Sequence, residues 1–157
     1  MRKQFTKGTA LSLLIVAIAL LTAATSYGQS SRKATANIPF DFVVGNTSFH
    51  AGEYNIDAIS NAGETLRISN AESGLSAVRL TSSVTSLDLP GKTKLVFHRY
   101  GSSYYLAEVW RAGESAGRQL VKSAGEKAAE HELAAIELKR QGVRSGFERV
   151  EVAATIQ

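Results

Sequence analysis

The feature that most restricts the fold of this chain is an alternation of apolar and polar residues between Lys33 and Arg111. Apolar residues fall on every second position, as in strands that bury one face and leave the other in water. Turn residues separate the runs, namely Gly45-Asn46, Asn61-Ala62-Gly63 and Pro90-Gly91. Six or seven short strands joined in this way predict a mainly β domain over residues 29–117, folded as a single antiparallel β-sandwich or a small β-barrel.

A different composition begins where the alternation ends. Residues 118–141 are rich in Ala, Glu, Lys and Leu, which favour helices, and they predict one C-terminal α-helix packed on the β domain. Gly125 weakens the start of this helix, so Ser123 is an alternative N-cap, with Glu126 completing a capping box. Residues 142–157 alternate again and are expected to form either a late edge strand or a tail.

Residues 1–28 have the plan of an export signal. Three cations precede an apolar run from Ala10 to Leu21, and small residues follow before a cleavage point expected ahead of Gln29. The run is shorter than the about 20 apolar residues of a membrane-spanning helix. The segment therefore predicts a Sec-type signal peptide and a periplasmic or secreted mature protein without a transmembrane span. An uncleaved N-terminal anchor is the alternative.

Charge and cysteine content exclude several classes of function. The whole chain carries a formal charge of +4, and loss of the three cations in residues 1–28, which contain no acid, leaves +1. A mature chain this close to neutral lacks the basic face that nucleic-acid binding requires. The absence of cysteine excludes disulfides, thiol catalysis, thiolate metal sites and lipid attachment as a lipoprotein. A cysteine-free exported domain of this size is typical of bacteria.

One motif suggests a hydrolase. Gly113-Glu114-Ser115-Ala116-Gly117 matches the G-x-S-x-G pattern of a nucleophile elbow. That elbow joins a strand to a helix at the top of a parallel sheet, whereas the sheet expected here is antiparallel. The only later histidine is His131, which lies inside the helix that would follow the serine and would point away from it. We therefore rank a Ser115 hydrolase last, and we expect no catalytic residue and no enzyme activity.

No cofactor or metal site is expected. His50, His98 and His131 are far apart in sequence and form none of the short spacings of zinc sites. His50 and Glu53 flank a turn and could chelate a metal weakly, but residues of this kind are more often solvated polar groups of the turn.

The side chains best suited to binding lie on a predicted hairpin of Lys94–Tyr100 and Tyr104–Trp110. A two-residue turn would place His98 opposite Tyr105 and Arg99 opposite Tyr104, and a three-residue turn would shift this pairing and exchange the faces. Functionally, the hairpin could be a platform for a carbohydrate or a peptide. Its candidate residues are His98, Arg99, Tyr100, Tyr104, Tyr105 and Trp110. Cross-strand aromatic pairing that only stabilises the hairpin is the favoured interpretation.

Five segments carry distinctive motifs. They are IPFDFVVGN within residues 36–46, AGEY at residues 51–54, FHRYG within residues 95–101, VW within residues 108–110 and GR within residues 117–123. In this order they resemble a family of small, uncharacterised, secreted bacterial proteins, over about residues 34–133. The resemblance implies no established activity or catalytic residue. It implies that Ser115 lies in an ordinary strand-to-helix connection. His50 stands where the family pattern has Pro before the Ala-Gly-Glu-Tyr turn, so a looser turn is expected there.

These observations favour a non-catalytic exported β-domain with an interaction or structural role in the cell envelope. Its partner would be an envelope or extracellular macromolecule. The alternative is a carrier of a small hydrophobic ligand or a carbohydrate, in a cup lined by Phe40, Phe42, Phe97 and Tyr105. A carrier needs a cavity of roughly 300 Å³ or more. A chain of this length with six or seven strands favours a filled interior.

Overall fold

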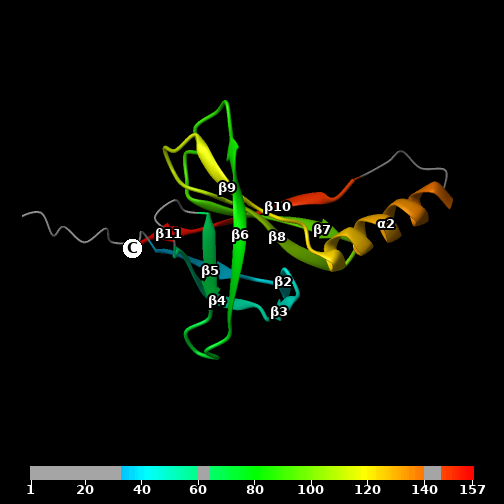
Figure 1. Ribbon diagram of the computed structural model, residues 1–157, viewed down its shortest axis with the longest axis horizontal. Coiled ribbons are helices and arrows are strands. Elements are labelled where there is room, and N and C mark those ends of the chain that lie inside the picture. Colours follow the sequence, from blue (N-terminus) through cyan, green and yellow to red (C-terminus); the bar gives the residue numbers. More distant parts are fainter. Residues whose placement is uncertain (1–32, 60–63, 140–145) are drawn as a thin grey trace, which may run out of the picture. The chain divides into compact units, whose positions relative to one another are not determined.

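The computed structural model describes residues 33–59, 64–139 and 146–157, which form β-strands and one helix (Figure 1). The first strands are β1 Ala34–Ile38, β2 Phe42–Val44, β3 Thr47–Phe49, β4 Gly52–Ala58, β5 Thr65–Ser69 and β6 Ser76–Thr85. The later elements are β7 Lys94–Tyr100, β8 Ser103–Trp110, β9 Ala116–Leu120, α2 Ala124–Lys139, β10 Glu148–Ala153 and β11 Thr155–Ile156. The predicted mainly β domain with a helix near its C-terminal end is confirmed. In these ranges, no helix has both the length and the apolar character that crossing a membrane requires.

Strand β6 joins the two halves of a sandwich-like sheet with the order β10-β7-β8-β9-β6-β5-β4-β1-β11. The first half of β6 pairs with β5 and its second half pairs with β9. Figure 1 shows β6 as the long strand at the centre of this arrangement. The short β2 pairs with β3 and, in the parallel sense, with β8. The order ends at β10 and β11 without closing on itself, so a sandwich describes the fold better than a barrel.

Aromatic rings fill the core between the two halves of the sandwich. Phe42 and Phe97 are almost completely buried, with ring centroids 5.5 Å apart, and Phe40 packs 5.2 Å from Phe97. Tyr105, the fourth residue of the hypothetical ligand cup, points to the opposite face of β8. Its hydroxyl donates to the carbonyl of Gly125 at 3.4 Å. The four residues therefore pack in two different places and do not line one cup.

A β-bulge changes which residues of β8 face the core. The pairing of β8 with β7 shifts by one residue at Ala107. Leu106 before the bulge and Val109 after it both belong to the core, although strict alternation would put them on opposite faces. Glu108 and Trp110 consequently face outward, where the indole Nε1 of Trp110 donates to a carboxylate oxygen of Glu108 at 2.6 Å.

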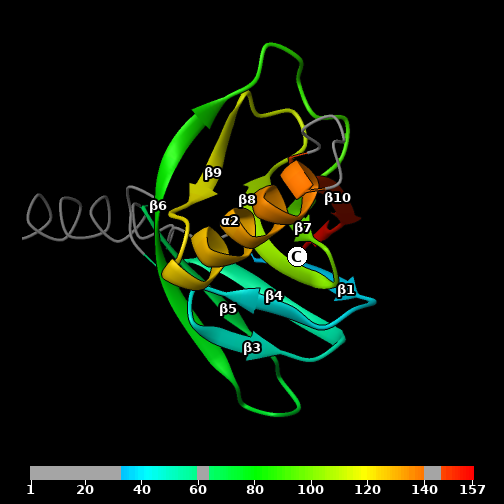
Figure 2. The ribbon, with the colours of Figure 1, turned by 90° about the vertical axis from the view of Figure 1, so that its right-hand side faces the viewer.

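The helix starts later than expected. Residues 118–120 belong to β9, which pairs with β6 and β8, so α2 begins at Ala124 instead of residue 118. Ser123 is the N-cap, because its hydroxyl oxygen accepts the backbone N–H of Glu126 at 3.1 Å. Figures 1 and 2 show that α2 starts beside the β7–β8 hairpin and continues past its end.

The C-terminal segment is built into the sheet. Strand β10 pairs with β7 over six residue pairs, and β11 pairs with β1. Of the two expectations for this segment, the edge strand is therefore correct for residues 148–156. The predicted signal peptide, the end of the predicted helix at 140–141 and residues 142–145 lie outside the described residues.

Candidate functional site

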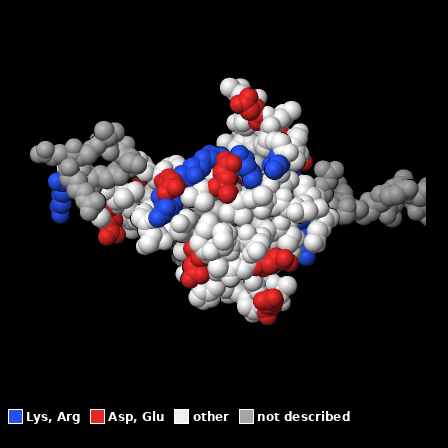
Figure 3. Space-filling model, turned by 180° about the vertical axis from the view of Figure 1, so that it is seen from behind, with Lys and Arg blue, Asp and Glu red and all other residues white. Residues whose placement is uncertain are grey.

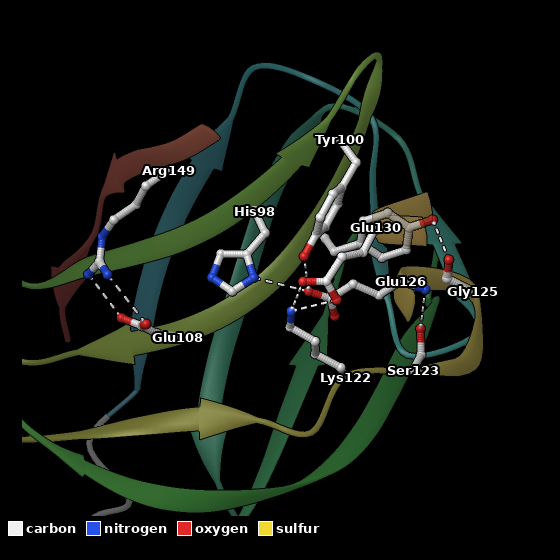
Figure 4. Close-up of polar contacts among 10 residues, drawn as sticks. His98, Tyr100, Glu108, Lys122, Ser123, Gly125, Glu126, Glu130 and Arg149 are labelled. Carbon is white, nitrogen blue, oxygen red and sulfur yellow. Dashed lines mark hydrogen bonds and ion pairs between the residues drawn. The ribbon is translucent and has the colours of Figure 1, made fainter. Parts of the chain in front are cut away.

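Of the four buried acidic or histidine side chains in the described residues, three lie on or against the outer face of the β7–β8 hairpin, namely His98, Glu108 and Glu126. The hairpin turn is two residues long, because Tyr100 pairs with Ser103. The turn residue Gly101 has a φ of 62°, which glycine adopts without strain. Figure 4 shows Glu126, from the first turn of α2, and Arg149, from β10, pointing toward this face.

Of the ion pairs among the described residues, that of His98 and Glu126 is the most deeply buried. The His98 Nδ1 lies 3.0 Å from the Glu126 Oε1, and the Tyr100 hydroxyl donates to the same oxygen at 3.4 Å (Figure 4). Both side chains of the His98–Glu126 pair are only 6% exposed. The His98 ring also stacks on Phe147, with centroids 3.7 Å apart. We call these four residues the His98 cluster; it joins β7, the helix and the residue just before β10.

An ion pair of Lys122 and Glu130 borders the His98 cluster. The Lys122 Nζ donates to both carboxylate oxygens of Glu130, at 2.8 and 2.9 Å. The hydrogen bond from Lys122 lowers the pKa of Glu130. Burial acts to lower the pKa of Lys122, but hydrogen bonds with Glu130 and Tyr100 outweigh burial and raise it. Because folding lowers the pKa of Glu130, the pair stabilises the fold at neutral pH, and this contribution is lost as the pH falls through the folded-state pKa.

A second network connects β10 with β8 across the intervening strand β7. The Arg149 Nη2 donates to the Glu108 Oε2 at 2.9 Å, and its Nη1 donates to the Glu108 Oε1 at 3.4 Å. This two-point geometry is the strong form of an arginine–carboxylate contact. Trp110, which donates to the same carboxylate, packs against Gly117 on β9. A Cβ at Gly117 would lie 2.7 Å from ring atoms of Trp110, so the missing side chain makes room for the indole.

The remaining candidates, Arg99 and Tyr104, face the other side of the hairpin. Tyr104 stacks on Phe40 with ring centroids 4.0 Å apart. The Arg99 guanidinium lies 5.5 Å from the Tyr104 ring centroid, and its Nη1 is 3.0 Å from a carboxylate oxygen of Glu148. His98, Tyr100, Tyr105 and Trp110 point to the helix side instead. The six predicted residues therefore do not share one binding platform.

The contacts of His98 with Glu126 and of Glu108 with Arg149 connect the β7–β8 hairpin to α2 and to β10. In the described parts of the chain, every buried side-chain nitrogen and oxygen has a hydrogen-bond partner. Sequence reasoning missed the partners of the aromatic hairpin, which are Glu126, Lys122, Glu130, Arg149 and Phe147. Only Glu126 had a local signal, as the last residue of the capping box. Its carboxylate nevertheless reaches His98, 28 residues earlier, and no local pattern reports such a contact.

Ser115 lies in a turn between the antiparallel strands β8 and β9. Its carbonyl accepts the backbone N–H of Ser86 at 2.9 Å. The expected strand-to-helix connection is wrong, because β9 occupies the place where the helix was predicted to start. A nucleophile elbow requires a helix directly after the serine, so this site lacks the geometry that the motif needs.

His50 pairs with Asp41 and not with Glu53. The His50 Nδ1 lies 3.3 Å from the Asp41 Oδ2, and the Ala51 N–H donates to the Asp41 Oδ1 at 2.9 Å. The hydrogen bond from Ala51 is the main cause of the lowered pKa of Asp41. The Tyr54 hydroxyl donates to the His50 carbonyl at 2.7 Å. Hydrogen bonds from Ala51 and from Tyr54 thus stabilise the turn that follows His50.

Opposite charges alternate along β10. Lys94 lies 2.7 Å from Glu151, which also approaches Arg149 at 3.4 Å. In the view of Figure 3, basic and acidic side chains lie next to each other across this face. The charges along this edge therefore largely neutralise one another.

Exposed apolar side chains gather on the outer face near the middle of β6. They are Ile59, Val78, Leu80 and Val121, with 49%, 51%, 70% and 61% of their surface exposed. The Ile59 N–H donates to the carbonyl of Thr65, which pairs with Leu80. Leu120, the last residue of β9, pairs with Thr81 of β6. The next residue, Val121, therefore lies opposite Leu80. We call the four exposed residues the apolar row.

Comparison of the chain with models of protein families, with curated proteins and with solved structures finds no match. The resemblance to small secreted bacterial proteins therefore stays a prediction, and the function must be inferred from the residues themselves.

Proposed function

We propose that this chain is a non-catalytic, exported domain that binds another protein in the bacterial cell envelope through the apolar row. The observation that carries the proposal is the exposure of Val78 and Leu80 on β6 and of Ile59 and Val121, which directly follow β4 and β9. Contiguous apolar residues of this kind on a water-facing surface mark interaction sites. The row is small, so the complex is expected to be weak or transient.

The charges beside the apolar row favour a protein as the partner. Arg67 pairs directly with Val78 across β5 and β6, and its Nη2 lies 2.6 Å from an Asp57 carboxylate oxygen. This border carries both signs, whereas a nucleic acid or an anionic membrane surface attracts an excess of cations. An apolar centre with a mixed polar border is the usual composition of a protein interface.

The buried polar networks support the non-catalytic part of the proposal. His98, Glu126, Glu108 and Arg149 are the side chains best suited to acid–base chemistry or anion binding, and each is paired with another side chain. Their contacts fasten α2 and β10 to the β7–β8 hairpin, which is sufficient to account for their burial.

A photo-crosslinking amino acid placed at position 80 tests the partner surface in intact producing cells. We expect a discrete, light-dependent adduct with one protein. The matched control carries the crosslinker at Leu87, which is fully exposed outside the row. Val121→Asp should remove the adduct at position 80, because it puts a charge into the interface. Equal adducts at positions 80 and 87, or none at position 80, would contradict the proposed surface.

Export is tested separately by the N-terminus of the protein recovered from those cells. We expect a mature chain that begins near Gln29 and is found outside the cytoplasm, since residues 1–28 have the charge and apolar pattern of a signal peptide. Peptide mass mapping of the periplasmic and culture fractions makes the measurement. A cytoplasmic protein that retains Met1 would refute this part of the proposal.

A further inference from the structure

Strand β10 lies at one end of the strand order, and only one of its two edges is paired within the described fold. It pairs with β7 over six residue pairs on one side. Among the described residues, no strand pairs with its other side. The edge of a sheet presents unpaired backbone N–H and C=O groups, which another strand can bind.

The backbone groups of alternate residues point to this open edge. The N–H of Ala154, one position beyond β10, donates to the carbonyl of Thr93, one position before β7, at 2.9 Å. Backbone direction alternates along a strand, and the pairing of β10 with β7 runs without a register shift. Even-numbered residues therefore bond to β7, whereas Arg149, Glu151 and Ala153 direct their backbone groups to the open edge.

Charge selects one register when this edge meets the same edge of a second copy. A two-fold axis perpendicular to the sheet makes the strands antiparallel, and outward-pointing residues must then face each other. Arg149 opposite Arg149, or Glu151 opposite Glu151, places like charges together and is unfavourable. Arg149 opposite Glu151 gives two pairs of opposite charge, with Val150 facing Val150 at the axis. Registers shifted further leave fewer residues of β10 paired.

We propose that β10 pairs with β10 of a second copy of this chain, antiparallel and about a two-fold axis at Val150. The side chains of Arg149 and Glu151 are 45% and 44% exposed, so both can reach the second copy. A guanidinium and a carboxylate each take several hydrogen-bond partners, so the new contact adds to the one between Arg149 and Glu108. On the other face, Val150 and Val152 pack against the core, and the paired strands extend that apolar surface into the second copy.

The predicted assembly is a closed dimer. A two-fold axis uses the same edge of both copies, so pairing through β10 stops at two. The shared edge is short, since β10 has six residues, and a small interface gives a weak dimer that depends on protein concentration. The dimer goes beyond the proposed interaction with another protein, because β10 contributes no residue to the apolar row. Two apolar rows in one particle would raise its avidity for a partner with repeated sites.

A single introduced cysteine tests the register, because the chain has none of its own. Facing residues at the axis have Cα atoms about 4.5 Å apart, within the range that a disulfide spans. Val150→Cys should therefore form a disulfide-linked dimer under mild oxidation. Val152→Cys is the matched control, since the two copies of residue 152 would lie roughly 14 Å apart. Equal disulfide formation by the two variants, or none by Val150→Cys, would overturn the proposal.

Sedimentation velocity over a wide range of protein concentration tests the role of charge. Glu151→Lys puts a cation opposite Arg149 in both halves of the interface and should weaken dimerisation about tenfold or more. Glu148→Lys is the matched control, because it also removes one exposed ion pair, that with Arg99, but lies opposite Val152 of the second copy. It should dimerise nearly as the unchanged protein does.

Two outcomes of the sedimentation experiment contradict the dimer. They are an unchanged protein that stays monomeric at every concentration and equal dimerisation by the Glu151→Lys and Glu148→Lys variants. Val121→Asp, which changes the apolar row, should leave dimerisation intact. The proposed dimer and the proposed partner surface therefore fail independently.

Discussion

Replacing Glu126 with Ala is expected to lower the free energy of unfolding by about 3 kcal/mol or more. The change removes the oxygen that lies 3.0 Å from the His98 ring nitrogen and accepts the Tyr100 hydroxyl. The His98 ring nitrogen and the Tyr100 hydroxyl would then be buried under α2 without the carboxylate oxygen as a hydrogen-bond partner, and solvent has little access to replace it. Urea unfolding followed by circular dichroism measures the loss.

Two further variants show whether the effect comes from the buried contact. Glu126→Gln keeps an acceptor at the same place and should cost clearly less than Glu126→Ala. Glu132→Ala removes an exposed carboxylate from the same helix and should change stability by no more than about 0.5 kcal/mol. Similar losses for Glu126→Ala and Glu132→Ala would mean that the His98 cluster does not hold the helix.

Replacing Phe97 with Ala is expected to cost about 3–5 kcal/mol of stability. Phe97 has no exposed surface, and its ring packs edge-on against Phe40 at 5.2 Å and Phe42 at 5.5 Å. Removing the ring leaves a cavity that the surrounding strands cannot close fully. Equilibrium unfolding in guanidinium chloride measures the cost, with Leu87→Ala as the control at a fully exposed position.

The Phe97 variant also distinguishes a filled core from a ligand cup. A side chain that lined an empty cup would have few neighbours to lose, so its removal would cost less than about 1 kcal/mol. Such a small loss, or a wild-type stability that depends on an added hydrophobic ligand, would favour the carrier interpretation.

The sequence predicted the fold class because alternation and turn residues are local signals. It underestimated the number of strands: eight of the described strands, β1 to β8, lie between Lys33 and Arg111, where six or seven were expected. β2 and β3 have three residues each and β11 has two, so they are too short to show a period. β9 was assigned to the helix, because Arg118, Gln119 and Leu120 favour helices when considered alone. Its pairing with β6 and β8 overrides that preference.

The candidate site was predicted less well than the fold. The pairing of His98 with Tyr105 was one of two alternatives for the hairpin, and it is the one observed. The outward position of Trp110 depends on the bulge at Ala107, which strict alternation does not reveal. The contact between Glu108 and Arg149 joins residues 41 positions apart, and only the folded sheet brings them together.

The pairing of β11 with β1 has a consequence for the order of events during synthesis. Ala34 in the first strand pairs with Ile156, and the carbonyl of Lys33 accepts the N–H of Gln157 at 2.8 Å. A growing polypeptide thus exposes its earliest strand long before the matching residues leave the ribosome. Contacts so distant along the chain slow folding, and the open strand edges invite pairing with other chains. Completion of this fold therefore waits until residue 156 is available for pairing, and protection of the unpaired strand β1 matters most in the interval before then.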